Sequence, residues 1–163
     1  YKRQIPPFQL MFEGFDRPED RPHTLSWLWT QFAAGFAVML PMIWLFGQWG
    51  LESLVVIPIL INVVGDGLAE PVGVRFGKYR YKTKALFTDK EYFRTFEGSA
   101  CVLITGFIVI AMHADYFTTA QLVFAMLLVP TVMTLTEAYS PHTWDTPFLM
   151  FTGYISLLLV MQF

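Results

Sequence analysis

Long apolar runs alternate with short polar stretches along most of this chain. Five runs approach the length of about 20 mainly apolar residues that a membrane-crossing helix needs. They cover residues 26–48, 51–70, 98–115, 118–138 and 146–163. Pro41, Pro58 and Pro130 fall inside these runs, where we expect them to kink helices and not to end them. The pattern predicts an all-α fold: a polytopic membrane helical bundle with about five transmembrane helices.

The connections between the apolar runs are short, which indicates one compact unit. We expect residues 1–25 to form a cytoplasmic polar leader and residues 26–163 to form a single transmembrane domain. The chain starts at Tyr1, and its N-terminal stretch lacks the pattern of a signal peptide. We therefore expect the numbering to begin inside a longer protein.

Composition agrees with a membrane protein. The chain of 163 residues is 55% hydrophobic and only 15% charged, whereas soluble proteins carry about 25% charged residues. Its single cysteine, Cys101, lies in an apolar run and is expected to pack between helices. The net charge of −2 says little as a total, and no nucleic-acid partner is expected.

The positions of the basic residues predict the orientation. With five crossings, the leader, the connection from about 71 to 97 and the connection from about 139 to 146 share one side. All eleven Lys and Arg fall on that side, and the positive-inside rule assigns it to the cytoplasm. They are Lys2, Arg3, Arg17, Arg21, Arg75, Lys78, Arg80, Lys82, Lys84, Lys90 and Arg94.

Acidic residues gather at the cytoplasmic ends of the apolar runs. Asn62, Asp66 and Glu70 are four residues apart, which puts them on one face of a continuous helix. An ionised carboxylate inside the bilayer costs about 2.5–3.5 kcal/mol, so this stripe should face the bundle interior. Three further acids are expected at the same depth: Glu97, Glu137 and Asp145.

Two explanations of the acidic residues remain open. In the structural one, Asp66 pairs with Arg75 or Lys78 as part of a salt-bridge network. In the functional one, the acids hold Mg²⁺ through oxygen ligands, while the basic connection neutralises the phosphates of a substrate.

Small residues recur at every fourth position in the same stretch, namely Gly65, Ala69, Gly73 and Gly77. Such spacing permits close packing of helices in a membrane. We also expect Pro71 to interrupt the helix. Beyond that break, Gly67, Gly73 and Gly77 would let backbone N–H groups approach phosphate oxygens.

Three blocks of sequence carry a family resemblance. They are GDGLAEPVGVRFGK at 65–78, FEGSACV at 96–102 and TEAYSPHTWDTP at 136–147. At these residues the chain resembles the phytol kinase and dolichol kinase family, membrane enzymes that phosphorylate long-chain prenols with CTP. The likeness spans about residues 51–163, and Asp145-Thr146 stands where the family has Asp-Asn.

The resemblance implies a CTP- and Mg²⁺-dependent kinase that phosphorylates the hydroxyl of a membrane prenol (phytol, polyprenol or dolichol type) at the cytoplasmic interface. Residues 26–163 would then be the catalytic domain. The catalytic acids would be Asp66, Glu70 and Glu97. The metal ligands would be Asp66, Glu70, Glu137 and Asp145. The nucleotide and phosphate contacts would be Gly65, Gly67, Gly73, Arg75, Gly77, Lys78, Arg80, Arg94 and Ser99.

Two other functions remain open. A membrane cytidylyltransferase, which makes a CDP-lipid, also uses an acidic, glycine-containing signature near the end of a span, but it releases pyrophosphate and not CDP. A transporter or scaffold subunit would use intramembrane acids as an ion or proton path. Against transport, the polar residues gather at one face and no polar chain crosses the bundle.

Overall fold

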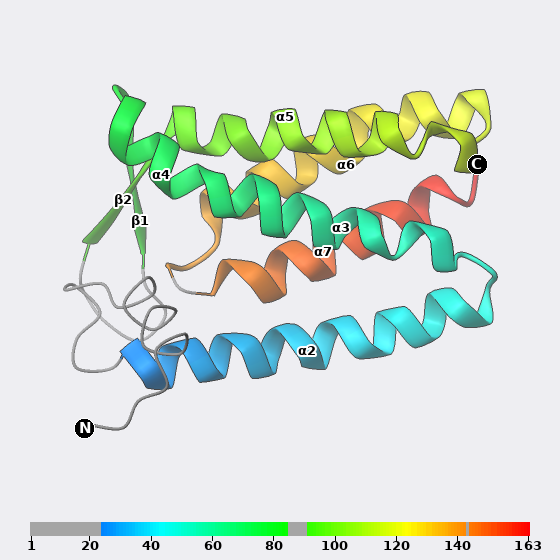
Figure 1. Cartoon of the computed structure of the whole chain (residues 1–163), viewed down its shortest axis with the longest axis horizontal. Helices are drawn as coiled ribbons and strands as arrows, with labels where there is room; N and C mark the ends of the chain where they lie inside the picture. The colour runs from blue at the N-terminus through cyan, green and yellow to red at the C-terminus, as the bar shows by residue number, and fades with distance from the viewer. Residues whose placement is uncertain (1–23, 85–90, 143) are drawn as a thin grey trace, which may run out of the picture.

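The computed structural model describes residues 24–84, 91–142 and 144–163 of the chain. Within this part, five helical segments run along the long axis of the molecule and a two-stranded ribbon lies at one end (Figure 1). The leader predicted at residues 1–25 lies almost entirely outside the described residues. The elements in chain order are α2 (Thr24–Gln48), η2 (Glu52–Leu54), α3 (Val56–Leu60), η3 (Ile61–Asp66), α4 (Gly67–Phe76), β1 (Arg80–Lys84), β2 (Glu91–Thr95), α5 (Phe96–Met112), η4 (Ala114–Tyr116), α6 (Thr119–Tyr139) and α7 (Asp145–Val160).

Among the described residues, three helices are long and apolar enough to cross a membrane. They are Leu25–Gln48, Glu52–Phe76 and Thr119–Tyr139. The second one joins η2, α3, the π-helix η3 and α4 into one continuous segment. α5 and α7 are also apolar but shorter, with 17 and 16 residues. The chain is therefore mostly helical and has the features of a multi-pass membrane protein.

The expectation of an all-α fold is wrong in the connection after the second apolar run. β1 and β2 form an antiparallel ribbon in which Tyr81 pairs with Arg94 and Thr83 pairs with Tyr92. These four side chains are buried or half-buried, whereas Phe93 between them is exposed. Alternation of this kind is the strand pattern, but five charged side chains in the two strands made it look like a polar loop.

The expected helix break at Pro71 is also wrong, because α4 continues through this residue to Phe76. A proline in a helix crowds the carbonyl four residues earlier. Here that carbonyl belongs to Gly67, which is exposed and has no neighbouring atoms where a side chain would lie. Gly73 therefore lies inside a helix and not in a loop.

The helices approach one another closely where glycines face prolines. A Cβ atom added to Gly106 of α5 would lie 2.8 Å from Cβ of Pro130 in α6. One added to Gly153 of α7 would lie 2.9 Å from Cβ of Pro58 in α3. Pro58 and Pro130 are thus buried at helix contacts and do not end their helices, as expected.

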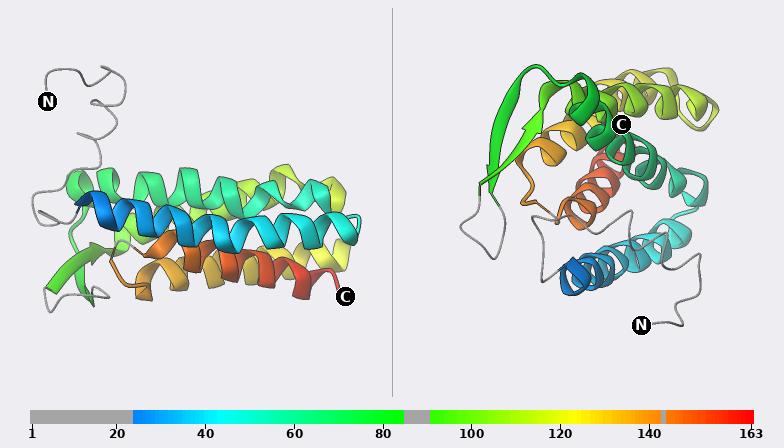
Figure 2. Two further views of the ribbon diagram at one scale, coloured as in Figure 1. Left: turned by 90° about the horizontal axis from the view of Figure 1, so that it is seen from below. Right: turned by 60° about the vertical axis from the view of Figure 1, so that its left-hand side comes forward.

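The helix α2 is attached to the bundle mainly along α7 (Figures 1 and 2). At the end away from the ribbon, the rings of Phe46 and Tyr154 meet edge to face with centroids 5.3 Å apart. The Tyr154 hydroxyl donates a hydrogen bond to the Val55 carbonyl at 3.2 Å. These contacts close the bundle at that end, while the opposite end of α2 borders a cleft.

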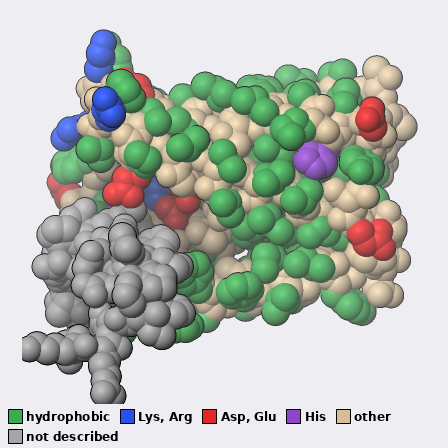
Figure 3. Space-filling model, viewed as in Figure 1, with side chains coloured by type: hydrophobic (Ala, Val, Ile, Leu, Met, Phe, Trp, Pro, Cys, Tyr) green, Lys and Arg blue, Asp and Glu red, His purple; other side chains and the backbone are tan. Residues whose placement is uncertain are grey.

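Charge is segregated between the two ends of the bundle. Figure 3 shows Lys and Arg side chains at the end that carries the ribbon. The described ones are Arg75, Lys78, Arg80, Lys82, Lys84 and Arg94. On the face that Figure 3 shows, most of the coloured side chains between the two ends are hydrophobic. This distribution agrees with the separation of charges expected from the sequence.

Candidate functional site

A cleft of about 1120 Å³ lies at the basic end of the bundle. Its walls come from α2 on one side and from η3, α4, the ribbon and the start of α7 on the others. Figure 3 shows acidic and basic side chains set back into this hollow. Small-molecule sites in proteins commonly have volumes of about 300–1,000 Å³, so the cleft has room for a nucleotide and part of a second molecule.

Nine of the residues expected to form a site line this cleft. They are Asp66, Gly67, Glu70, Gly73, Arg80, Arg94, Ser99, Glu137 and Asp145. Five others do not line it: Gly65, Arg75, Gly77, Lys78 and Glu97. The structure therefore brings together acids from three separate helical segments, as the sequence predicts, but it places much of the glycine-rich block elsewhere.

Arg94 of β2 is the electrostatic centre of the site. Its Nη1 donates to Oε1 of Glu137 at 2.7 Å and also to the Glu137 carbonyl, while Nη2 donates to Oδ2 of Asp145 at 3.0 Å. The three side chains are only 11%, 5% and 17% exposed. Burial alone would lower the pKa of Arg94, but the carboxylates of Asp145 and Glu137, with Asp66 farther away, outweigh it and raise that pKa.

The ribbon is held against the α6–α7 connection by contacts on both strands. The Thr83 hydroxyl donates to the Ser140 carbonyl at 3.2 Å, and the His142 backbone N–H donates to the Lys84 carbonyl at 2.9 Å. The ring of Tyr92 stacks on His142 with centroids 3.9 Å apart. Because Tyr92 and Arg94 share one face of β2, this docking directs the Arg94 guanidinium at the ends of α6 and α7.

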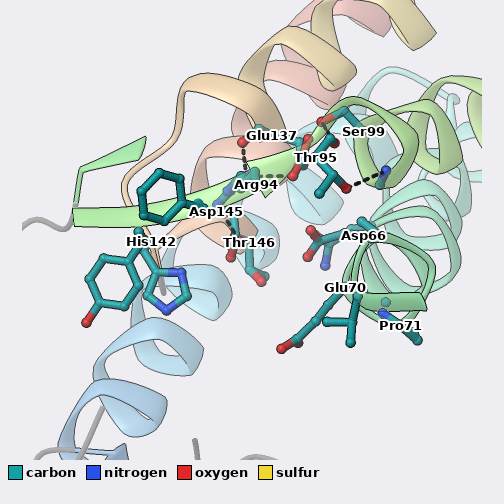
Figure 4. Close-up of a pocket in the computed structure, with 18 of the residues that line it drawn as sticks. Asp66, Glu70, Pro71, Arg94, Thr95, Ser99, Glu137, His142, Asp145 and Thr146 are labelled. Carbon is teal, nitrogen blue, oxygen red and sulfur yellow. Dashed lines mark hydrogen bonds and ion pairs between the residues drawn. The ribbon is translucent and has the colours of Figure 1, made fainter. Parts of the chain in front are cut away.

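Asp66 and Glu70 approach the cleft from the opposite side. Figure 4 shows both side chains on one helical segment, pointing into the space that separates them from Arg94, Asp145 and His142. Asp66 is half-buried and Glu70 is exposed. The ion pairs of Arg94 make part of the acidic set a salt-bridge network, although its members differ from the Asp66 pairs expected from spacing.

The arrangement of the carboxylates shows what kind of divalent-cation site these residues could form. Among the described residues, no group of three or more His, Cys, Asp or Glu stands ready to hold a metal ion. Mg²⁺, however, is usually bound by one or two carboxylates together with substrate phosphates. Oε2 of Glu137 is buried without a hydrogen-bond partner in the described part of the chain. The donor set therefore fits a cation that arrives with a polyphosphate, and not a cage made by protein alone.

Two glycines of the first block are accounted for by packing. A Cβ atom at Gly65 would lie 3.0 Å from Cα of Val102 in α5. One at Gly73 would lie 2.6 Å from the hydroxyl oxygen of Thr95, which caps α5 by accepting from the Gly98 N–H at 3.0 Å. Of the two explanations that the sequence offers for these small residues, close helix packing therefore accounts for Gly65 and Gly73.

Glu97 and Lys78 meet outside the cleft. Glu97 Oε1 accepts a hydrogen bond from the Lys78 backbone N–H at 3.0 Å. This contact ties the turn after α4 to the first turn of α5. The ends of the two helices that carry the first and second sequence blocks are therefore fixed to one another.

One residue that lines the cleft, Gln31, and one that contacts a lining residue, Tyr81, were not identified from the sequence. The Gln31 amide of α2 donates to the Thr146 hydroxyl at 2.9 Å and to Oδ1 of Asp145 at 3.2 Å. The hydroxyls of Tyr81 and Ser99 lie 2.6 Å apart and share a hydrogen bond. The signal available for Gln31 was an isolated amide inside an apolar run, and for Tyr81 it was the strand alternation around it.

Comparison with protein-family models, curated proteins and solved structures finds no match.

Proposed function

We propose that this protein is a CTP- and Mg²⁺-dependent kinase that transfers a phosphoryl group to the hydroxyl of a membrane prenol. The observation that carries this proposal is the presence of charged and apolar walls in one cleft. Carboxylates and guanidinium groups come from η3, α4, the ribbon, α6 and α7, whereas α2 contributes Trp27, Leu28 and Phe32. A polyphosphate and a lipid alcohol need these two environments side by side.

The location in the bundle supports the same conclusion. We propose that α2, the segment Glu52–Phe76, α5, α6 and α7 all cross the bilayer, with the basic end in the cytoplasm. The cleft then lies at the headgroup level of the inner leaflet. There, a water-soluble nucleotide can meet an alcohol whose tail stays in hydrocarbon.

Charge explains why the nucleotide would need a cation. The described residues that line the cleft contribute five carboxylates and two guanidinium groups. A triphosphate entering this excess of negative charge would be repelled. Mg²⁺ bound to the phosphates would supply the missing positive charge and stabilise charge that develops during phosphoryl transfer. Asp66 and Glu70 would hold it, with Glu137 and Asp145 nearby.

The chain's own residues have distinct roles in this proposal. Arg94 neutralises Glu137 and Asp145, and thereby lowers the repulsion that a nucleotide meets. Arg80 lies on the exposed rim of the cleft and binds phosphate as it enters. A carboxylate on the Asp66 wall accepts the proton of the attacking hydroxyl. The preference for CTP over other nucleotides comes from the family resemblance alone.

The test is an assay of purified protein in detergent with labelled CTP or ATP and phytol, a polyprenol or diacylglycerol. Formation of CDP and a prenyl phosphate supports a kinase, whereas pyrophosphate indicates a cytidylyltransferase. Asp66→Asn should lower kcat/KM by about a hundredfold or more, the usual size of a catalytic carboxylate's contribution. The matched control is Glu52→Gln, an exposed acid at the other end of the bundle. Equal activity of the two folded variants would refute the proposal.

A further inference from the structure

The cleft has an apolar part that nucleotide binding does not use. Phe32 of α2 lines one side of it, and Val63 of η3 and Val74 of α4 line the other. These side chains are 42%, 63% and 78% exposed. Because α2 is attached mainly along α7, it stands apart from η3 and α4 here (Figures 1 and 2). The apolar part of the cleft is therefore lined from both sides by helices that have membrane-crossing length.

A buried polar atom lies beside this apolar opening. Asn62 lines the cleft and is 8% exposed, and its Oδ1 has no hydrogen-bond partner among the described residues. A buried amide oxygen without a partner is costly, so such a group calls for a ligand or a water molecule. Asn62 also belongs to the π-helix η3, and π-helical turns are frequent at functional sites.

The position of Asn62 fits the head of a lipid and not the nucleotide. It lies four residues before Asp66 on the same helical segment, and therefore farther from the basic end of the bundle. The neighbouring residue Val63 is exposed toward the gap beside α2. A neutral hydrogen-bond acceptor next to an apolar passage matches a long-chain alcohol with a hydroxyl at its end.

We propose that a lipid alcohol enters this cleft sideways from the bilayer, between α2 and the segment formed by η3 and α4. Its hydroxyl donates a hydrogen bond to Oδ1 of Asn62, and its tail lies between Phe32 and Val63. The use of the bound alcohol as a phosphoryl acceptor rests on the proposed kinase function, and for that step the hydroxyl turns its single proton from Asn62 to the carboxylate that accepts it. The binding of the alcohol does not rest on that function.

Steady-state kinetics can distinguish the binding of the lipid tail from the binding of the hydroxyl. Val63→Trp fills the passage and should raise KM for phytol about tenfold, while KM for prenol, the single-isoprene alcohol, and KM for CTP stay within about twofold. The matched control is Val123→Trp, which adds the same side chain at a site on α6 that is 57% exposed. Asn62→Leu removes the acceptor and should raise KM for both alcohols about five- to tenfold. An equal rise in KM for phytol in the two tryptophan variants would overturn the proposal.

A binding experiment decides the matter even if no kinase activity is found. Purified protein in detergent is labelled with a long-chain alcohol that carries a photoreactive diazirine in its tail. Labelled peptides from α2 and η3, with labelling reduced by unlabelled phytol and by Val63→Trp, support the site. Equal competition by phytane, the matching hydrocarbon without a hydroxyl, would overturn the role of Asn62. Labelling spread evenly over the apolar helices would overturn the passage.

Discussion

Arg94 and Glu137 are 43 positions apart in the chain, yet Nη1 of one lies 2.7 Å from Oε1 of the other. The contact joins the second strand of a polar ribbon to the last turn of a membrane-length helix. Asp145, at the first turn of the next helix, accepts from the same guanidinium. One cation thus fixes the ends of two helices and the ribbon that covers them.

Removal of this cation should strongly destabilise the fold. Arg94→Met leaves the carboxylates of Glu137 and Asp145 buried without their partner, which costs about 3 kcal/mol or more. The control is Lys82→Met, because Lys82 pairs with Glu91 where both side chains are more than 60% exposed. Such an exposed pair contributes about 0–1 kcal/mol. Denaturant titration in detergent measures both, and similar losses would contradict the assigned role of Arg94.

The two glycines that flank Asp66 should respond differently to alanine. A Cβ atom at Gly65 would lie 3.0 Å from Cα of Val102, whereas Gly67 has nothing within 4 Å of that position. Gly65→Ala should therefore force α5 away and cost about 1–3 kcal/mol. Gly67→Ala, at the exposed start of α4, should be neutral or stabilising by up to about 1 kcal/mol. Measurement of the free energy of unfolding of both variants tests this prediction. An equal loss of stability in the two would show that helix packing is not the reason for glycine at position 65.

Tyr81 should give the protein a pH-dependent stability at alkaline pH. Its hydroxyl shares a 2.6 Å hydrogen bond with Ser99, and burial raises the pKa of Tyr81 above its ordinary value of 10.0. As the pH rises past that value, the unfolded chain loses its proton first, so the folded state loses stability. Tyr81→Phe should be less stable than the original chain by about 1 kcal/mol near neutral pH. That difference should shrink above about pH 10.

The control for this prediction is Tyr79→Phe, since Tyr79 is 70% exposed. Its effect on the free energy of unfolding should therefore be small. Unfolding curves at about pH 8 and about pH 11 are sufficient for the comparison. If the difference in the free energy of unfolding between Tyr81→Phe and the original chain is the same at both pH values, the raised pKa of Tyr81 is contradicted.

The helices were predictable because an apolar run of sufficient length has few alternatives in a membrane. The predicted run 118–138 and the observed helix Thr119–Tyr139 differ by one residue at each end. Pro71 misled the prediction at the end of the second run, because a proline inside a membrane-length helix does not have to end it, and α4 continues to Phe76.

The gathering of acidic residues at one end of the bundle was predictable from the sequence, but their ion-pair partners were not. Depth in a membrane follows from position along each span, so Asp66, Glu137 and Asp145 could be expected at one end. The choice of Arg94 as the partner of two of them depends on the ribbon, whose alternation was hidden by its charges. The Gln31 contact with Thr146 depends on the packing of α2 against α7, which no local pattern encodes.

The number of membrane crossings can be tested by labelling introduced cysteines, because the chain has only one cysteine of its own to replace. α5 has 17 residues and spans about 25 Å, somewhat less than the roughly 30 Å of bilayer hydrocarbon. If it crosses, Asp115 at its far end and Glu52 lie opposite Lys84. In a Cys101→Ser background, an impermeant maleimide added to intact bacterial cells should then label Asp115→Cys and Glu52→Cys. Lys84→Cys should react only after permeabilisation.

These three positions suit the experiment because their side chains are all exposed in the structure. Differences in labelling therefore report the side of the membrane and not burial in the protein. If Asp115→Cys reacts only after permeabilisation, as Lys84→Cys should, then α5 does not cross and the orientation of α6 and α7 changes with it. The cleft would still unite the same side chains, but the positive-inside argument would no longer place it at the inner leaflet.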